Sequence, residues 1–133
     1  MLYRNRLTGV IPPEIGNLRA LTGLNLGCNL LTGSIPPEIG HLTALTHLNL
    51  QSNLLTGGIP LELGNLASLK NLVLRINQLT GAIPIQLGRL KDLEWLSLSG
   101  NQLAGPMIDF KFDRIATQQF LGSLGFAPVA SYH

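Results

Sequence analysis

The sequence predicts an α/β solenoid, in which the chain winds through similar coils that pack against one another. Three observations support this fold class. An asparagine recurs every 24 residues, at Asn5, Asn29, Asn53, Asn77 and Asn101. Four Ile-Pro pairs keep the same interval, from Ile11-Pro12 to Ile83-Pro84. Leucine fills 29 of 133 positions, whereas Phe, Trp and Tyr together make up only 5%. A core of one aliphatic type in fixed register is typical of stacked repeats.

Each repeat contains a segment that we expect to form a strand. In residues 45–53, Leu48 and Leu50 alternate with polar residues, which is the period-two pattern of a half-buried strand. The same pattern recurs around residues 23–27, 71–75 and 95–99. Stacking of the coils would pair these strands into a parallel inner sheet. Asn53 then ends its strand, where its short amide can bond to the backbone of the turn.

A helical turn is expected on the opposite side of each coil. Pro36-Pro37 can begin it, because proline suits the first position of a helix. Gly40 closes the turn, and Leu42 returns to the core.

The consensus LxxLxxLxLxxNxLTGxIPxxLGxL, seen in residues 42–66, resembles the plant-type leucine-rich repeat. The resemblance covers residues 1–106, about four and a half coils. It implies a right-handed superhelix with a parallel inner sheet, 3-10 or helical turns, and a second short strand in each LTGxIP segment. Family members include receptor-kinase ectodomains, polygalacturonase-inhibiting proteins and some plant antifreeze proteins, and most of them bind proteins or peptides. This chain departs from secreted members because it lacks their paired cysteine caps.

Residues 107–133 do not follow the repeat and are expected to form a C-terminal helical cap. Asp113 can act as the N-cap of a helix over the segment DRIATQQFL, and Gly122 can end it. Phe112, Ile115, Ala116 and Phe120 would then lie on or beside one apolar face that covers the last coil. The alternative is a helix that binds a partner or a membrane, although its polar face holds few cations.

Composition excludes several classes of function. The net charge of +2, with no cluster of basic residues, argues against nucleic-acid binding. No apolar run is long enough to span a membrane. Cys28 is the only cysteine, so no internal disulfide can form. Without a signal peptide or an N-glycosylation sequon, the chain is expected to be cytoplasmic, or to be a secreted or receptor-ectodomain fragment if its N-terminus is truncated.

The candidate catalytic and metal-binding side chains are expected to lie apart, so we predict no enzyme activity, no metal and no cofactor. His41 falls on the convex side, whereas His47 falls on the strand face. Cys28 lies near the exit of its strand, whereas His47 lies near the entry of the next strand. The offset of five positions along the strand direction is about 16 Å, which is too far for a Cys–His pair. One acidic residue per coil forms a solvated row of Glu14, Glu38 and Glu62.

The outward strand positions vary between coils while the inward positions remain leucine, which indicates a surface for a protein or peptide partner. Trp95 and Arg75 belong to residue types that are enriched in binding hot spots. We expect Trp95 to be exposed on the sheet, unless the C-terminal tail folds over it. The predicted partner-binding residues are His47, Asn49, Gln51, Asn71, Val73, Arg75, Trp95 and Ser97.

Two other functions remain open at this stage. A column of threonines could bind ice if strand spacing holds its members about 4.8 Å apart; it consists of Thr8, Thr32, Thr56 and Thr80. Resemblance to the polygalacturonase inhibitors implies inhibition of a secreted wall-degrading enzyme.

A homodimer through the first coil is a further expectation. The strand around Leu2 would be an unpaired edge, and such edges template pairing with another chain. A second copy related by two-fold symmetry could cover it.

Overall fold

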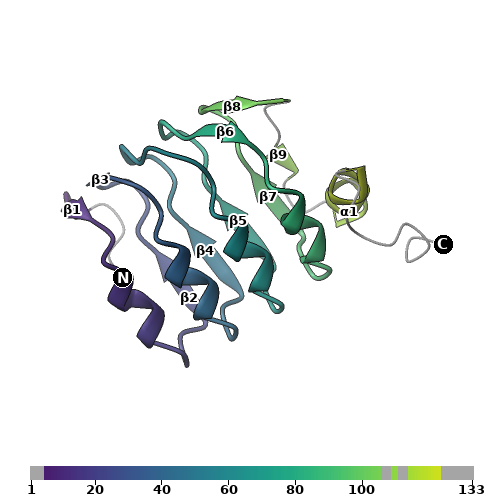
Figure 1. Ribbon diagram of the computed structural model, residues 1–133, viewed down its shortest axis with the longest axis horizontal. Coiled ribbons are helices and arrows are strands. Elements are labelled where there is room, and N and C mark those ends of the chain that lie inside the picture. Colours follow the sequence, from purple (N-terminus) through teal and green to yellow (C-terminus); the bar gives the residue numbers. More distant parts are fainter. Residues whose placement is uncertain (1–4, 106–108, 111–113, 124–133) are drawn as a thin grey trace.

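In the computed structural model the coils follow one another side by side along the molecule (Figure 1). The structure describes residues 5–105, 109–110 and 114–123. This arrangement confirms the solenoid predicted from the 24-residue repeat.

A five-stranded inner sheet runs the length of the solenoid in the order β2-β4-β5-β7-β9. The first four strands are parallel and one coil apart in sequence, with Gly23 opposite His47, His47 opposite Asn71, and Asn71 opposite Trp95. These strands are β2 (Gly23–Asn25), β4 (His47–Asn49), β5 (Asn71–Val73) and β7 (Trp95–Ser97). Each is three residues long and therefore shorter than the strand predicted from the alternating pattern of the sequence.

Second strands occur at the LTGxIP segments, as the family resemblance implies. They form two-stranded parallel sheets, β1 (Thr8–Val10) with β3 (Leu30–Thr32) and β6 (Thr80–Ala82) with β8 (Gln102–Ala104). Between them the third coil contributes an isolated bridge, Ser34 to Thr56. The strands of this side lie at the top of Figure 1.

Short 3-10 helices form the side opposite the inner sheet: η1 (Pro13–Asn17), η2 (Pro37–His41), η3 (Leu61–Asn65) and η4 (Ile85–Arg89). In η2, Leu42 N donates to Ile39 O at 3.0 Å, so the turn closes where Leu42 enters the core. Gly40 is required there, since a Cβ atom would lie 2.6 Å from the carbonyl oxygen of Glu62 in the next coil. Glycine therefore sets how closely the helical turns stack.

The core is one continuous cluster of leucine and isoleucine between the inner sheet and the helical turns. Leu48, Leu72 and Leu96 occupy the same inward strand position in successive coils and are fully buried. Each coil therefore shares its buried surface with the next one, which explains why the repeats occur in series.

The recurring asparagines tie neighbouring coils together. Asn53 Oδ1 accepts from Leu31 N at 3.0 Å, and Asn53 Nδ2 donates to Leu26 O and Leu50 O at 3.0 and 3.1 Å. Asn77 repeats the pattern with Leu55 N, Leu50 O and Leu74 O. Each buried amide thus bonds backbone groups that neither sheet pairs, since the chain turns away from the strand at this point.

At the C-terminal end, β9 (Asp109–Phe110) pairs antiparallel with β7, and α1 (Arg114–Ser123) packs on η4 and β7. The expected N-cap Asp113 and the apolar Phe112 lie outside the described residues. The expected apolar face is wrong at Ile115, whose side chain is 72% exposed. The buried side chains of α1 include Thr117, Gln118 and Leu121 instead.

Buried polar side chains of α1 donate to backbone carbonyls of the last coil. Gln118 Nε2 donates to Leu90 O at 2.8 Å and to Leu93 O at 3.2 Å, and Thr117 Oγ1 donates to Glu94 O at 3.4 Å. The equivalents of Glu94 O, which are Thr46 O and Lys70 O, accept from the next coil, so Thr117 supplies a hydrogen bond that a further coil would otherwise provide. The division of the chain at residue 106 stays a prediction.

Candidate partner-binding site

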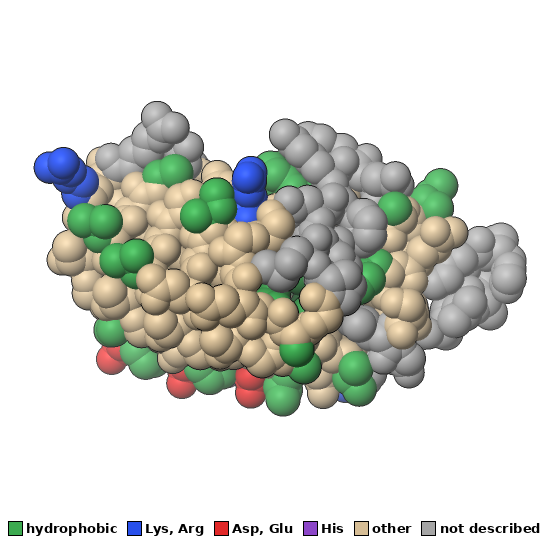
Figure 2. Space-filling view, turned by 90° about the horizontal axis from the view of Figure 1, so that it is seen from above, with side chains coloured by type: hydrophobic (Ala, Val, Ile, Leu, Met, Phe, Trp, Pro, Cys, Tyr) green, Lys and Arg blue, Asp and Glu red, His purple; other side chains and the backbone are tan. Residues whose placement is uncertain are grey.

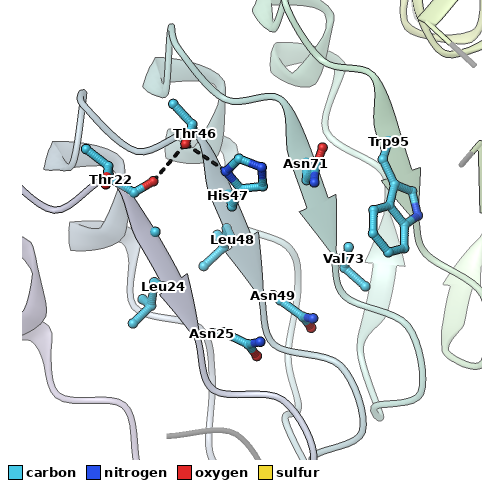
Figure 3. Close-up of a pocket in the computed structure, with 11 residues that line it drawn as sticks. Thr22, Leu24, Asn25, Thr46, His47, Leu48, Asn49, Asn71, Val73 and Trp95 are labelled. Carbon is cyan, nitrogen blue, oxygen red and sulfur yellow. Dashed lines mark hydrogen bonds between the residues drawn. The ribbon is translucent and has the colours of Figure 1, made fainter. Parts of the chain in front are cut away.

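The register of the inner sheet sorts its outward side chains into two rows across the strands. Side chains two positions apart on a strand share a face, so one row holds Gly23, His47, Asn71 and Trp95. The second row holds Asn25, Asn49, Val73 and Ser97. Figure 3 shows the labelled members of both rows on one side of the sheet.

These rows line a groove of about 690 Å³ across β2, β4, β5 and β7. It brings together five of the predicted binding residues: His47, Asn49, Asn71, Val73 and Trp95. Gln51, Arg75 and Ser97 do not line it. Sequence reasoning missed Thr22 and Thr46, which also line the groove. The signal that could have found them is their shared position just before successive strands.

One end of the groove is apolar. The indole of Trp95 extends along the sheet toward Val73 in Figure 3. Trp95 is half-buried rather than exposed, and Val73 is only 1% exposed. Ser97 is likewise buried, at 2%. The expectation that these outward side chains are exposed is therefore wrong, since the indole of Trp95 lies beside Val73 and β9 pairs with β7 at Ser97.

The opposite end of the groove holds His47 beside a threonine hydroxyl. Thr46 Oγ1 donates to Thr22 O at 3.0 Å, and the same oxygen lies 2.7 Å from His47 Nδ1. Thr22 O also accepts from the backbone N–H groups of Thr46 and His47. The contact with Thr46 orients the ring of His47, whose side chain is exposed.

Two asparagines contribute amide donors to the groove. Asn25 Oδ1 accepts from Gly27 N and Asn49 Oδ1 accepts from Gln51 N, each at 3.0 Å. These turns commit the oxygen of each amide and fix its orientation. The Nδ2 groups are therefore available to a bound molecule and lie one coil apart, about 4.8 Å.

Arg75 lies beyond Val73 along the same strand, next to the groove. Its side chain is half-buried, and its Nε is buried with no hydrogen-bond partner. Among the described residues, no outward position of β2, β4, β5 or β7 is acidic. Lys70 and Glu94 precede β5 and β7, so the nearest charges of both signs lie at the edge of the sheet. The face itself is neutral to basic.

The threonine column on the second strands does not have the expected spacing. Thr32 lies opposite Val10, not Thr8, because these strands pair with an offset of 22 residues instead of 24. Thr56 likewise lies opposite Ser34, and Thr80 opposite Gln102. Neighbouring threonines are therefore displaced by two residues along the strand, which separates them by about 8 Å.

The face that carries these threonines is chemically mixed. Figure 2 shows hydrophobic side chains scattered among neutral polar ones, with the acidic side chains along one edge. Val10 is 61% exposed and Leu30 47% exposed. The expected row of threonines about 4.8 Å apart is thus wrong, because the 24-residue repeat does not report the stagger between strands.

No group of three or more His, Cys, Asp or Glu side chains in the described part of the chain is placed to hold a metal ion. None of the helices described is long and apolar enough to cross a membrane.

The stacked coils, the parallel inner sheet and the asparagine ladder define this chain as a leucine-rich-repeat solenoid. The family model for the leucine-rich repeat matches residues 1–55. The chain is a plant-type leucine-rich-repeat protein, as both the repeat consensus and its structural neighbours show. No curated protein sequence matches the chain.

Three solved plant structures illustrate the likeness. The BIR3–SERK2 complex of Arabidopsis thaliana contains a chain that is 42% identical, with a TM-score of 0.75, over 79% of this chain and 56% of that one. A plant ice-binding protein is 43% identical, with a TM-score of 0.70, over 73% of this chain and 32% of that one. The ectodomain of the Arabidopsis receptor kinase HAESA, in complex with an IDA peptide hormone, is 41% identical, with a TM-score of 0.70, over 74% of this chain and 16% of that one. This chain therefore spans about half of the first of these and less of the others.

Proposed function

We propose that this chain is a non-catalytic recognition module that binds a peptide or protein through the inner-sheet groove. The observation that carries the proposal is the groove itself. It joins an apolar end at Trp95 and Val73 to oriented polar groups at His47 and Asn49, within a volume of about 690 Å³. Apolar walls with a few placed polar groups are the usual composition of a binding site.

The structural neighbours support a recognition role. One is a complex of two proteins and another holds a peptide hormone on a receptor ectodomain. Their likeness favours the ectodomain setting over the cytoplasmic one for this chain. The alternative of enzyme inhibition has no specific observation in its favour, and the homodimer through the first coil stays a prediction.

Ice binding is the weaker alternative. The similarity to a plant ice-binding protein supports it. However, the staggered threonines and the exposed Val10 and Leu30 give this face no regular row of one residue type.

The test is to select peptides from a random display library on the whole chain and to measure their affinity for variants. Replacing both Trp95 and Arg75 by alanine should weaken binding at least about 100-fold, because each belongs to a residue type whose loss typically costs about 2 kcal/mol at a hot spot. Circular dichroism should show an unchanged fold.

The matched control changes the convex face. Replacing Glu14, Glu38 and Glu62 by glutamine should alter affinity less than about threefold, since these side chains lie in the 3-10 turns away from the groove. Strong loss in the glutamine variant, with none in the alanine variant, would overturn the proposal.

A further inference from the structure

The spacing of the groove-lining rows specifies the conformation of the bound segment. His47 and Trp95 lie in the same row, two coils apart. At about 4.8 Å per coil, a segment lying across the strands meets these two side chains about 9.6 Å apart. The regular peptide conformations differ in how well their side-chain repeat fits this distance.

A polyproline-II segment fits it closely. Its rise of about 3.1 Å and three residues per turn return side chains to the same side every 9.3 Å or so. An extended β-strand returns them every 6.6 Å or so, and an α-helix has a pitch of about 5.4 Å and a width of about 10 Å. Neither the β-strand repeat nor the helix pitch stays in register with the coils beyond one step.

The hydrogen-bonding groups of the groove suit the same conformation. A polyproline-II backbone makes no internal hydrogen bonds, so its carbonyl oxygens need outside donors. Asn25 and Asn49 offer Nδ2 groups whose oxygens are already committed to Gly27 N and Gln51 N. Both amides are therefore oriented before any ligand binds, and both belong to the second row of the groove.

The apolar end suits a proline ring. Aromatic side chains line the grooves in which proline-rich segments dock, and here Trp95 extends beside the buried Val73. Gly23 completes the row at the other end without obstruction, since a Cβ atom there would meet nothing within 4 Å. The buried and unpartnered Arg75 Nε requires an acceptor, which disfavours a cationic segment beside it.

We propose that the groove binds a neutral or acidic proline-rich segment in the polyproline-II conformation, with a proline at every third position. This inference rests on the proposed function and names the class of its partner. One proline ring lies against the indole of Trp95, and the next proline, three positions away, lies over the imidazole of His47. Carbonyls of the segment over β4, and over β2 beyond it, accept from Asn49 and Asn25 respectively.

The experiment titrates the whole chain with capped peptides and follows the emission of Trp95, the only tryptophan in the sequence. The probe is a repeat of Pro-Ala-Gln. One comparison peptide has the same composition in a scrambled order that places no two prolines three positions apart, and another has glycine in place of proline. The Pro-Ala-Gln repeat should bind at least about tenfold more tightly than either, a difference of about 1.4 kcal/mol. Equal affinities, or no binding of the repeat, would overturn the inference.

A matched pair of variants locates the bound peptide. Asn49→Asp keeps the oxygen that accepts from Gln51 N and removes the Nδ2 donor, so it should weaken binding about tenfold and leave the unfolding midpoint unchanged. Asn65→Asp adds the same charge at an exposed position of η3 and should leave affinity unchanged. Equal effects of the two variants would show that the peptide does not lie on the groove amides.

The outcome also separates this inference from the proposed function. Library peptides that lack the three-residue proline spacing but lose affinity on replacement of Trp95 would refute the polyproline-II partner and retain the groove. Library peptides that ignore every groove variant would refute both.

Discussion

Replacing Asn53 by alanine tests whether the asparagine ladder holds the coils together. In the folded chain its amide oxygen accepts from Leu31 N, and its nitrogen donates to Leu26 O, Leu50 O and Gln51 O. Leu26 O also accepts from Asn29, and Leu50 O from Asn77, so these carbonyls keep a partner in the variant. Leu31 N loses the side-chain oxygen that it bonds.

The expected magnitude follows from this inventory. A buried backbone N–H without a partner costs about 1–3 kcal/mol, and each of the other bonds contributes about 0.5–1.5 kcal/mol net. We expect a loss of about 3 kcal/mol in the free energy of unfolding. For a chain of 133 residues, this corresponds to a fall of about 10 °C in the melting temperature.

The assay is urea unfolding followed by circular dichroism, with Asn65→Ala as the matched control. Asn65 is an exposed asparagine in η3 whose side chain makes no hydrogen bond to the described residues, so its variant should stay within about 0.5 kcal/mol of the unchanged chain. If Asn53→Ala is no less stable than Asn65→Ala, the coils do not depend on the ladder and the reasoning is wrong.

Two further predictions concern the backbone and the C-terminal helix. Ser52→Gly should raise the free energy of unfolding by about 0.5–1 kcal/mol, because Ser52 has a φ of 56°, a conformation that glycine adopts without strain. Ser68→Gly, at a position without a positive φ, should lower it by a similar amount. A change of the same sign in both variants, measured by urea unfolding, would contradict this. Gln118→Ala should lower the free energy of unfolding by about 1–3 kcal/mol and speed amide exchange in residues 90–98, because it removes donors from Leu90 O and Leu93 O. The control is Gln119→Ala, which changes an exposed neighbour. Equal exchange rates in the two variants would refute a capping role for Gln118.

The repeat determines the parts of the fold that occur once in every coil. Leu48 and Leu72 could be placed inward because leucine occupies that position in four coils, and Asn53 could be placed at the end of its strand because asparagine occupies its position in five. The alternation of inward and outward positions likewise identified most of the groove. Periodicity carries this information since the coils pack on copies of themselves.

The repeat cannot report what differs between coils or what lies between columns. The offset of 22 residues between Val10 and Thr32 has no signature in a 24-residue period, so the spacing of the threonines was wrong. The left-handed position after the inner strands has no consistent residue type, because Cys28, Ser52 and Ile76 occupy it in three coils and glycine, at Gly100, only in the fourth. At one outward position Val73 and Ser97 are buried whereas Asn25 and Asn49 are only half-buried, a difference between the two ends of the sheet that the repeat does not contain.

Several side chains of this chain both stabilise the fold and present hydrogen-bonding groups to the groove. Asn25 and Asn49 each use one end of the amide to form a turn and present the other end to the groove. Thr46 Oγ1 donates to the backbone of the preceding coil and lies 2.7 Å from His47 Nδ1, which orients the ring. Because the folded chain already orders these groups, a ligand need not immobilise them, and each side chain left mobile would otherwise cost about 0.5–1.5 kcal/mol on binding. The scaffold therefore improves affinity by orienting groups in advance, and partner choice can change with the outward residues while the inward leucines stay the same.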